Sequence, residues 1–183
     1  MICNLNNYQP ASLDAPAGLT DLLKELPEPV ISNYAGFLNS KPEFKETLFR
    51  YFSSPEKFPA ITPLIIYNEV NHQMVTLLTN RNETPEEPGE PNSILSHVRA
   101  YGFDETFLCS DCYGQLSCSS CAIEVLTGDL NNPDPRDEEF DMLDIDEAKP
   151  PTEKTRLSCQ AQIAKTPLLV KIRASEKKVL SKV

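Results

Sequence analysis

Features of an exported or membrane-bound protein are missing from this sequence of 183 residues. Its six cysteines are too sparse for a disulfide-rich secreted scaffold. The opening residues, MICNLNNYQPASLDAP, have neither the basic start and apolar run of a signal peptide nor the arginine-rich, acid-poor character of a transit peptide. No apolar run approaches the roughly 20 residues of a membrane-spanning helix. We therefore expect a soluble intracellular protein, located in the cytoplasm.

Positive charge is also in short supply. The chain has 17 Lys and Arg against 27 Asp and Glu, which gives a formal net charge of -10. Because phosphate binding depends on Lys and Arg, this composition argues against nucleic acid as a partner. The acidity lies mostly in residues 61–183, which carry twenty acids and twelve bases. Such a surface favours partner proteins with positively charged faces.

Cysteine is concentrated in one stretch, residues 108–126, with the sequence LCSDCYGQLSCSSCAIEVL. Four thiols lie in this stretch and a fifth lies further on in RLSCQA: Cys109, Cys112, Cys118, Cys121 and Cys159. Thiolates that converge from a tight loop and one distant position suit an iron–sulfur cluster, because each iron of a two-iron core takes two cysteine sulfurs. Two CxxC pairs in the stretch also allow a zinc site, but that site would leave Cys159 without a role.

Three motifs agree in order and distance: CYGQLSCSSC, DEEFDMLD and TRLSCQ. Together they closely resemble the adrenodoxin-like [2Fe-2S] ferredoxins, both the monooxygenase partners and the iron–sulfur-assembly type, over roughly Pro63 to Ala174. The resemblance implies an α+β fold, a β-grasp ferredoxin domain preceded here by a small helical extension. It also implies which thiols ligate the one [2Fe-2S] cluster of each chain: Cys112, Cys118, Cys121 and Cys159.

The function that the resemblance implies is a one-electron carrier and not a bond-making enzyme. In the family, an acidic helix docks both the ferredoxin reductase and the electron-acceptor protein through their basic surfaces. That helix matches five acidic residues of this chain: Asp137, Glu138, Glu139, Asp141 and Asp144. Without the family, a solvated helix face would be the simpler interpretation of these residues. We expect a monomer.

Two positions depart from the family pattern. Ala122 follows Cys121, where adrenodoxin-like proteins usually carry His, so any bracing of the loop through that side chain is absent. Cys109 has no counterpart in the pattern and is a spare thiol, an alternative ligand or a redox-active group. The acceptor and its pathway stay open, and so does a different class of function, a non-redox interaction module in which zinc serves only as a staple.

The chain divides into three predicted parts. Residues 1–60 form a helical extension that begins with a loose polar arm, in which Cys3 is an unrelated thiol, and its third helix begins at a capping box on Ser40 and Glu43. Residues 61–175 form the ferredoxin domain, with a hairpin over 63–79 and a proline-rich insertion, TPEEPGEP. Residues 176–183 form a basic tail. The extension either packs on the rest of the protein or docks a dedicated partner.

Overall fold

The computed structural model describes residues 1–144 and 150–173. The predicted basic tail, residues 176–183, lies outside this range. None of the helices in the described ranges is long and apolar enough to cross a membrane.

One mixed sheet of six strands forms the centre of the molecule, in the order β1-β3-β2-β6-β4-β5. Strand β2 pairs parallel to β6, and the other neighbouring strands pair antiparallel. The strands are β1 (Ile2–Asn4), β2 (Ile61–Asn68), β3 (Gln73–Asn80), β4 (Ala122–Thr127), β5 (Thr155–Leu157) and β6 (Leu168–Ile172). The expected α+β fold and the expected opening hairpin, β2 and β3, are confirmed.

Each face of the sheet carries its own hydrophobic core. Because side chains alternate between the two faces of a strand, Leu64 and Ile66 of β2 join one core while Ile65 and Tyr67 join the other. The first core also contains α4 (Ile94–Ala100) and the residues around the cysteine loop. Burial on both faces explains why β2 reads as a continuous apolar run and not as an alternating one.

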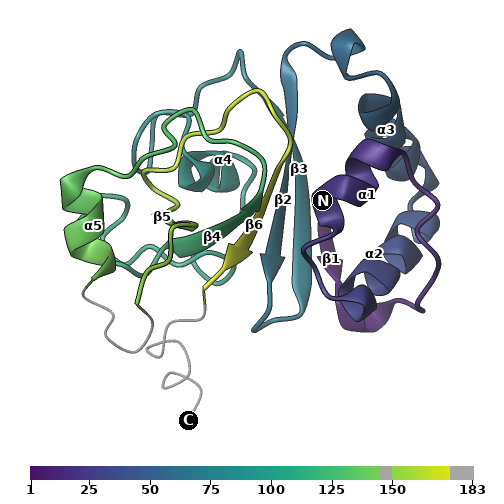
Figure 1. The fold of residues 1–183 in the computed structure, drawn as a ribbon, viewed down its shortest axis with the longest axis horizontal. Coiled ribbons are helices and arrows are strands. Elements are labelled where there is room, and N and C mark those ends of the chain that lie inside the picture. Colours follow the sequence, from purple (N-terminus) through teal and green to yellow (C-terminus); the bar gives the residue numbers. More distant parts are fainter. Residues whose placement is uncertain (145–149, 174–183) are drawn as a thin grey trace.

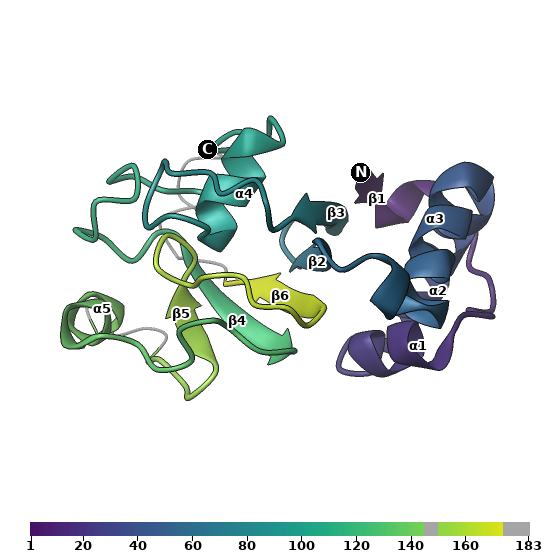
Figure 2. The same ribbon diagram turned by 90° about the horizontal axis from the view of Figure 1, so that it is seen from above.

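The second core is covered by three helices that come from the N-terminal part of the chain: α1 (Ala17–Leu23), α2 (Glu28–Ser40) and α3 (Pro42–Ser53). They form a layer on one side of the sheet, as Figure 2 shows from above. Tyr34 of this layer and Thr76 of β3 share a buried hydrogen bond of 2.7 Å between their hydroxyls. The helical stripes therefore pack against the sheet as well as against each other.

Two expectations for the N-terminal part are wrong. The first residues are not a loose arm, because β1 adds a strand to the edge of the sheet and Cys3 is completely buried in the second core. A short 3-10 helix, η1 (Leu5–Asn7), follows β1. Ser40 does not cap α3 either, since it ends α2 and its hydroxyl donates to the Phe37 carbonyl at 2.7 Å. Lys41 precedes α3 instead, and its side chain makes no cap hydrogen bond.

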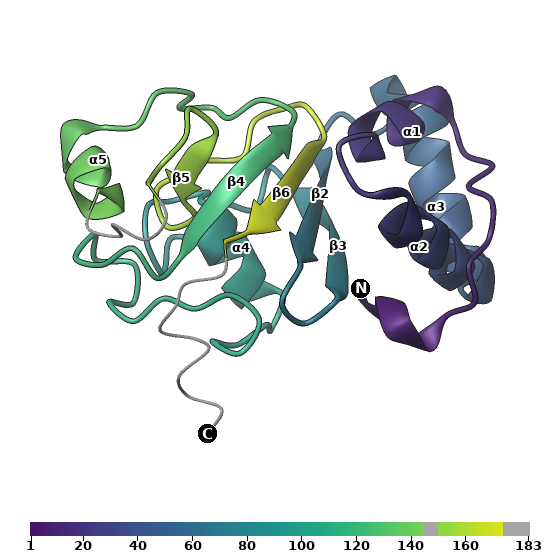
Figure 3. The ribbon, with the colours of Figure 1, turned by 60° about the horizontal axis from the view of Figure 1, so that its bottom comes forward.

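Helix α4 has a sequence signal at each of its ends. Ser93 caps it by accepting a hydrogen bond from the Ser96 N–H at 3.1 Å, and Gly102 ends it with a φ of 82°. The last helix, α5 (Asp137–Leu143), carries the acidic motif. In Figures 1 to 3 it lies at the end of the molecule opposite to α1, α2 and α3. The acidic helix and the N-terminal layer are therefore separate surfaces.

Candidate metal centre

Strand pairing brings the distant cysteine to the cysteine loop. Cys121 directly precedes β4, and Cys159 is the second residue after β5. The antiparallel pair of Ala122 with Leu157 sets these two strand ends side by side, and the Ser158 N–H donates to the Cys121 carbonyl at 3.1 Å. Cys112 and Cys118 lie in the loop between α4 and β4. The Cys112 and Cys159 thiols also interact electrostatically, so this loop approaches the two strand ends.

The thiols meet as two pairs. Cys112 contacts Cys118, and Cys121 contacts Cys159. The inner pair, Cys121 and Cys159, is buried, while the outer pair is partly exposed. All six cysteines are described, and none forms a disulfide. Within residues 1–144 and 150–173 no group of three or more His, Cys, Asp or Glu side chains is placed so that it could hold a metal ion. Two thiols for each iron is the arrangement that a two-iron core requires.

Local hydrogen bonds favour the charged form in one thiol of each pair. Burial opposes ionisation of Cys112, but hydrogen bonds from the Ser117 backbone, the Cys118 and Ser117 side chains and the Gln115 backbone together lower its pKa. Contact with the Cys159 thiol and the nearby groups of Ser158 lower the pKa of Cys121 to about 7, against the effect of burial. The same contact and burial raise the pKa of Cys159. Thiolates are the form that binds metal.

One buried hydroxyl at this site lacks a partner. Ser158 Oγ is fully buried beside the Cys121 thiol, and it makes no hydrogen bond of normal geometry among the described residues. A buried polar group without a partner costs roughly 1–3 kcal/mol. A cluster sulfur or thiolate would accept this hydrogen bond, because such sulfurs are stabilised by nearby donors. The donor chemistry of the site therefore fits an iron–sulfur cluster.

Two glycines allow the proline-rich insertion to pack directly on the cysteine loop. A Cβ on Gly89 would lie 2.5 Å from the Cys159 carbonyl oxygen, and one on Gly114 would lie 2.4 Å from the Gly89 nitrogen. Both residues have positive φ, which glycine adopts without strain. The Glu90 N–H then donates to the Cys159 carbonyl at 2.8 Å. The insertion is thus a wall of the site and not a free surface loop.

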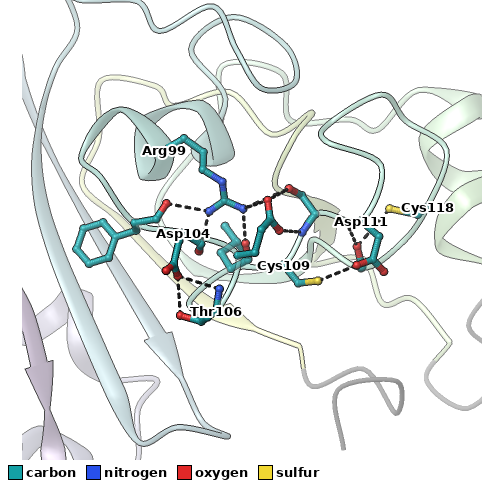
Figure 4. A network of polar contacts seen from close by, with 11 residues as sticks. Arg99, Asp104, Thr106, Cys109, Asp111 and Cys118 are labelled. Carbon is teal, nitrogen blue, oxygen red and sulfur yellow. Dashed lines mark hydrogen bonds and ion pairs between the residues drawn. The ribbon is translucent and has the colours of Figure 1, made fainter. Parts of the chain in front are cut away.

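Cys109 contacts an acidic side chain of the same loop. Its thiol donates to an oxygen of the Asp111 carboxylate at 3.2 Å (Figure 4).

In the same network, Arg99 donates to the carbonyls of Phe103, Asp104 and Leu108 and forms an ion pair of 2.7 Å with Glu105. The Glu105 carboxylate accepts from the Ser110 N–H at 2.6 Å. This network fixes the start of the cysteine loop, and sequence reasoning missed it because Arg99 lies in α4, well before the first predicted ligand.

One of the five predicted docking residues is not on the surface, and this prediction is corrected. Glu139 is 1% exposed and binds the Arg156 guanidinium with both carboxylate oxygens, at 2.9 Å each. It also accepts from the Leu157 N–H at 2.7 Å. Leu157 packs in the first core, so Glu139 turns inward to reach Arg156 and β5. The other four acidic residues are exposed: Asp137, Glu138, Asp141 and Asp144.

A family model matches the part of the chain that contains this site. Residues 80–164 match the family model of the 2Fe-2S iron-sulfur cluster binding domain. This part of the chain is a [2Fe-2S] ferredoxin domain. The resemblance drawn from the three motifs is confirmed at this level, and a [2Fe-2S] cluster is the cofactor of the domain. The match also supports an electron-carrier role.

Solved ferredoxin structures are among those similar to this chain. A ferredoxin from Rhodopseudomonas palustris HaA2 has a TM-score of 0.44 and 19% sequence identity, over 61% of this chain and 95% of that chain. An ISC-like [2Fe-2S] ferredoxin from Pseudomonas putida has a TM-score of 0.42 and 22% identity, over 61% and 92%. Reduced putidaredoxin from Pseudomonas putida, a variant, has a TM-score of 0.44 and 17% identity, over 63% and 99%. No curated protein matches the chain in sequence.

The ligand assignment generates the first prediction. Replacing any one of Cys112, Cys118, Cys121 or Cys159 by Ser should abolish or strongly alter the visible spectrum of the [2Fe-2S] domain, because one of the two irons would lose one of its two cysteine ligands. Cys109→Ser is the matched control and should leave the spectrum nearly intact, since its thiol contacts Asp111. Equal loss at Cys109 would overturn the assignment.

The buried ion pair generates the second prediction. Glu139→Gln should lower the free energy of unfolding by about 3–5 kcal/mol, because it leaves the buried Arg156 charge without its partner. Glu138→Gln, on the exposed side of the same helix, is the control and should change it by less than roughly 0.5 kcal/mol. Urea titrations followed by circular dichroism measure both. A loss no larger at Glu139 than at Glu138 would contradict the described burial.

Proposed function

We propose that this protein is a one-electron carrier that accepts an electron from a ferredoxin reductase and passes it to an acceptor protein. The observation that carries the proposal is the meeting of two thiol pairs, Cys112 with Cys118 and Cys121 with Cys159, within a [2Fe-2S] domain. When bound, the cluster supplies reversible one-electron chemistry. The chain supplies the ligands, the donors and the docking surface.

The protein stabilises the charge that an added electron brings. Backbone N–H groups of Ser117 and Gln115 favour negative charge on Cys112, and the Ser120 hydroxyl lies 3.2 Å from the Cys118 sulfur. The Ser158 hydroxyl offers one more donor at the inner pair. Donors to cluster ligands and burial set the reduction potential of such sites. The partly exposed outer pair is the side from which an electron has the shortest path to the surface.

Helix α5 is the proposed docking surface. Asp137, Glu138, Asp141 and Asp144 are exposed, and Phe140 among them is 46% exposed, so an apolar side chain stands in an acidic face. This combination suits a partner with a basic rim and an apolar contact. The helix is attached to the segment that carries Cys159, because Glu139 binds Arg156 and accepts a hydrogen bond from the Leu157 N–H. A partner that docks on α5 would therefore bind a helix that is attached to the strand leading to Cys159.

Several finer predictions belong to this proposal. The acceptor serves either iron–sulfur assembly or a monooxygenase, the protein is a monomer, and it works in the cytoplasm. The alternative, a zinc-stapled interaction module, requires a site built on Cys109 without Cys159. The contact between Cys121 and Cys159 favours the cluster instead.

The acidic face generates the third prediction. Asp141→Asn combined with Asp144→Asn should slow electron transfer from a ferredoxin reductase several-fold at low salt, because long-range attraction to a basic surface speeds encounter. The rate of the variant should also depend less on salt, because two of the charges that salt screens have been removed. The screening length is about 8 Å at physiological ionic strength. The measurement is the stopped-flow rate of reduction over a salt series, with the visible spectrum as a check on the cluster.

The control for this experiment lies at the other end of the molecule. Asp21→Asn combined with Glu25→Gln removes the same charge from the α1 region and should leave rate and salt dependence close to wild type. If the α5 double variant also behaves as wild type, the docking surface is not on α5.

A further inference from the structure

Arg136 joins three segments of the chain beside the metal centre. It directly precedes α5, and its guanidinium donates from Nη2 to Glu90 Oε1 at 2.7 Å and to Gln160 Oε1. Glu90 belongs to the proline-rich insertion TPEEPGEP, which forms a wall of the site, and Gln160 directly follows Cys159. A single side chain therefore connects the wall, the docking helix and a predicted ligand of the cluster.

The amide of Gln160 is held between Arg136 and Cys159. Gln160 is 3% exposed, and its Nε2 donates to the Cys159 sulfur at 3.6 Å and to the Cys159 carbonyl at 3.3 Å. An amide has an oxygen that only accepts and a nitrogen that only donates. Because the Arg136 cation engages the oxygen in a charge-assisted hydrogen bond, the nitrogen is the end that faces the sulfur. A flipped amide would bring its oxygen toward the thiolate and its nitrogen toward a cation.

Arg136 is itself held in place from the other side. The Glu90 carboxylate fixes the guanidinium, and the Glu90 N–H donates to the Cys159 carbonyl at 2.8 Å. The backbone of Glu90 cannot move away freely, since the preceding Gly89 lies directly against Cys159. The ring of contacts from Cys159 through Glu90, Arg136 and Gln160 back to Cys159 is closed.

We propose that Arg136 is a positioning residue that raises the reduction potential of the cluster by orienting the Gln160 amide toward the Cys159 sulfur. The inference rests on the proposed role of Cys159 as a ligand. A donor to a ligand sulfur stabilises the negative charge that reduction adds, so reduction becomes easier. Glu90 secures Arg136, which gives the proline-rich insertion a role in tuning the centre.

A simpler effect of Arg136 must be separated from this one. Any cation near the cluster raises its potential by charge alone. The Arg136 side chain is 56% exposed, so salt screens that direct effect. Orientation of a buried amide is not screened. The two effects also differ in additivity, because a residue that acts through Gln160 has nothing to act on once the donor of Gln160 is removed.

A double-mutant cycle tests the proposal on the cluster-loaded protein. The variants are Arg136→Met, Gln160→Met and both together, and the readout is the midpoint potential from spectroelectrochemical titration at low and at high salt. Both single variants should have lower potentials than wild type. The double variant should have the potential of Gln160→Met alone, and the shift at Arg136→Met should persist at high salt. Arg136→Lys keeps a cation and a donor and should stay near wild type.

Three results of the cycle would contradict the proposed role of Arg136. Additive shifts in the cycle, a shift that disappears at high salt, or no shift at Arg136→Met would each overturn the positioning role. If Gln160→Met loses its visible spectrum, Gln160→Leu repeats the cycle, and the salt dependence of Arg136→Met decides the point without any change at Gln160. A wild-type protein without a cluster spectrum would instead refute the proposed function, and the potentials would not be measured.

Discussion

The metal centre depends on the antiparallel pairing of β4 with β5. Three of the predicted ligands share one loop, but the fourth is far along the chain, and a two-iron core needs two sulfurs on each iron. The register of Ala122 with Leu157 sets Cys121 beside Cys159. The buried Glu139–Arg156 pair and the hydrogen bond from the Leu157 N–H then fix α5 to β5. The same short strand therefore positions a predicted ligand and attaches α5.

The two faces of the sheet carry different parts of the protein. The face that carries α4 and the cysteine loop holds the metal centre, and the face that carries α1, α2 and α3 is closed by the second core. The N-terminal layer also adds β1 to the edge at β3, so the chain before the ferredoxin domain completes the sheet as well as covering it. Because α5 lies at the opposite end of the molecule, this layer leaves the acidic face open.

Much of the fold and of the candidate site could be predicted from local sequence. The apolar run of β2, the cap at Ser93 and the stop at Gly102 are short-range signals, and the spacing of the cysteines indicates a metal centre, with a cluster as the first hypothesis and zinc as the alternative. Glu139 could not be told from its acidic neighbours, because its inward direction depends on Arg156, a residue seventeen positions away. Nor does sequence show that Gly89 touches Cys159 or that Arg136 holds Gln160. Such contacts arise only from tertiary packing.

The most direct test of the account counts electrons and metal in the purified protein. Chemical analysis of iron, zinc and acid-labile sulfide should give two irons and two sulfides for each chain, as a [2Fe-2S] centre requires. An anaerobic reductive titration should then bleach the visible spectrum with one electron for each chain, and reoxidation should restore it. A colourless protein that contains zinc, or a coloured one that takes up no electron reversibly, would contradict the account.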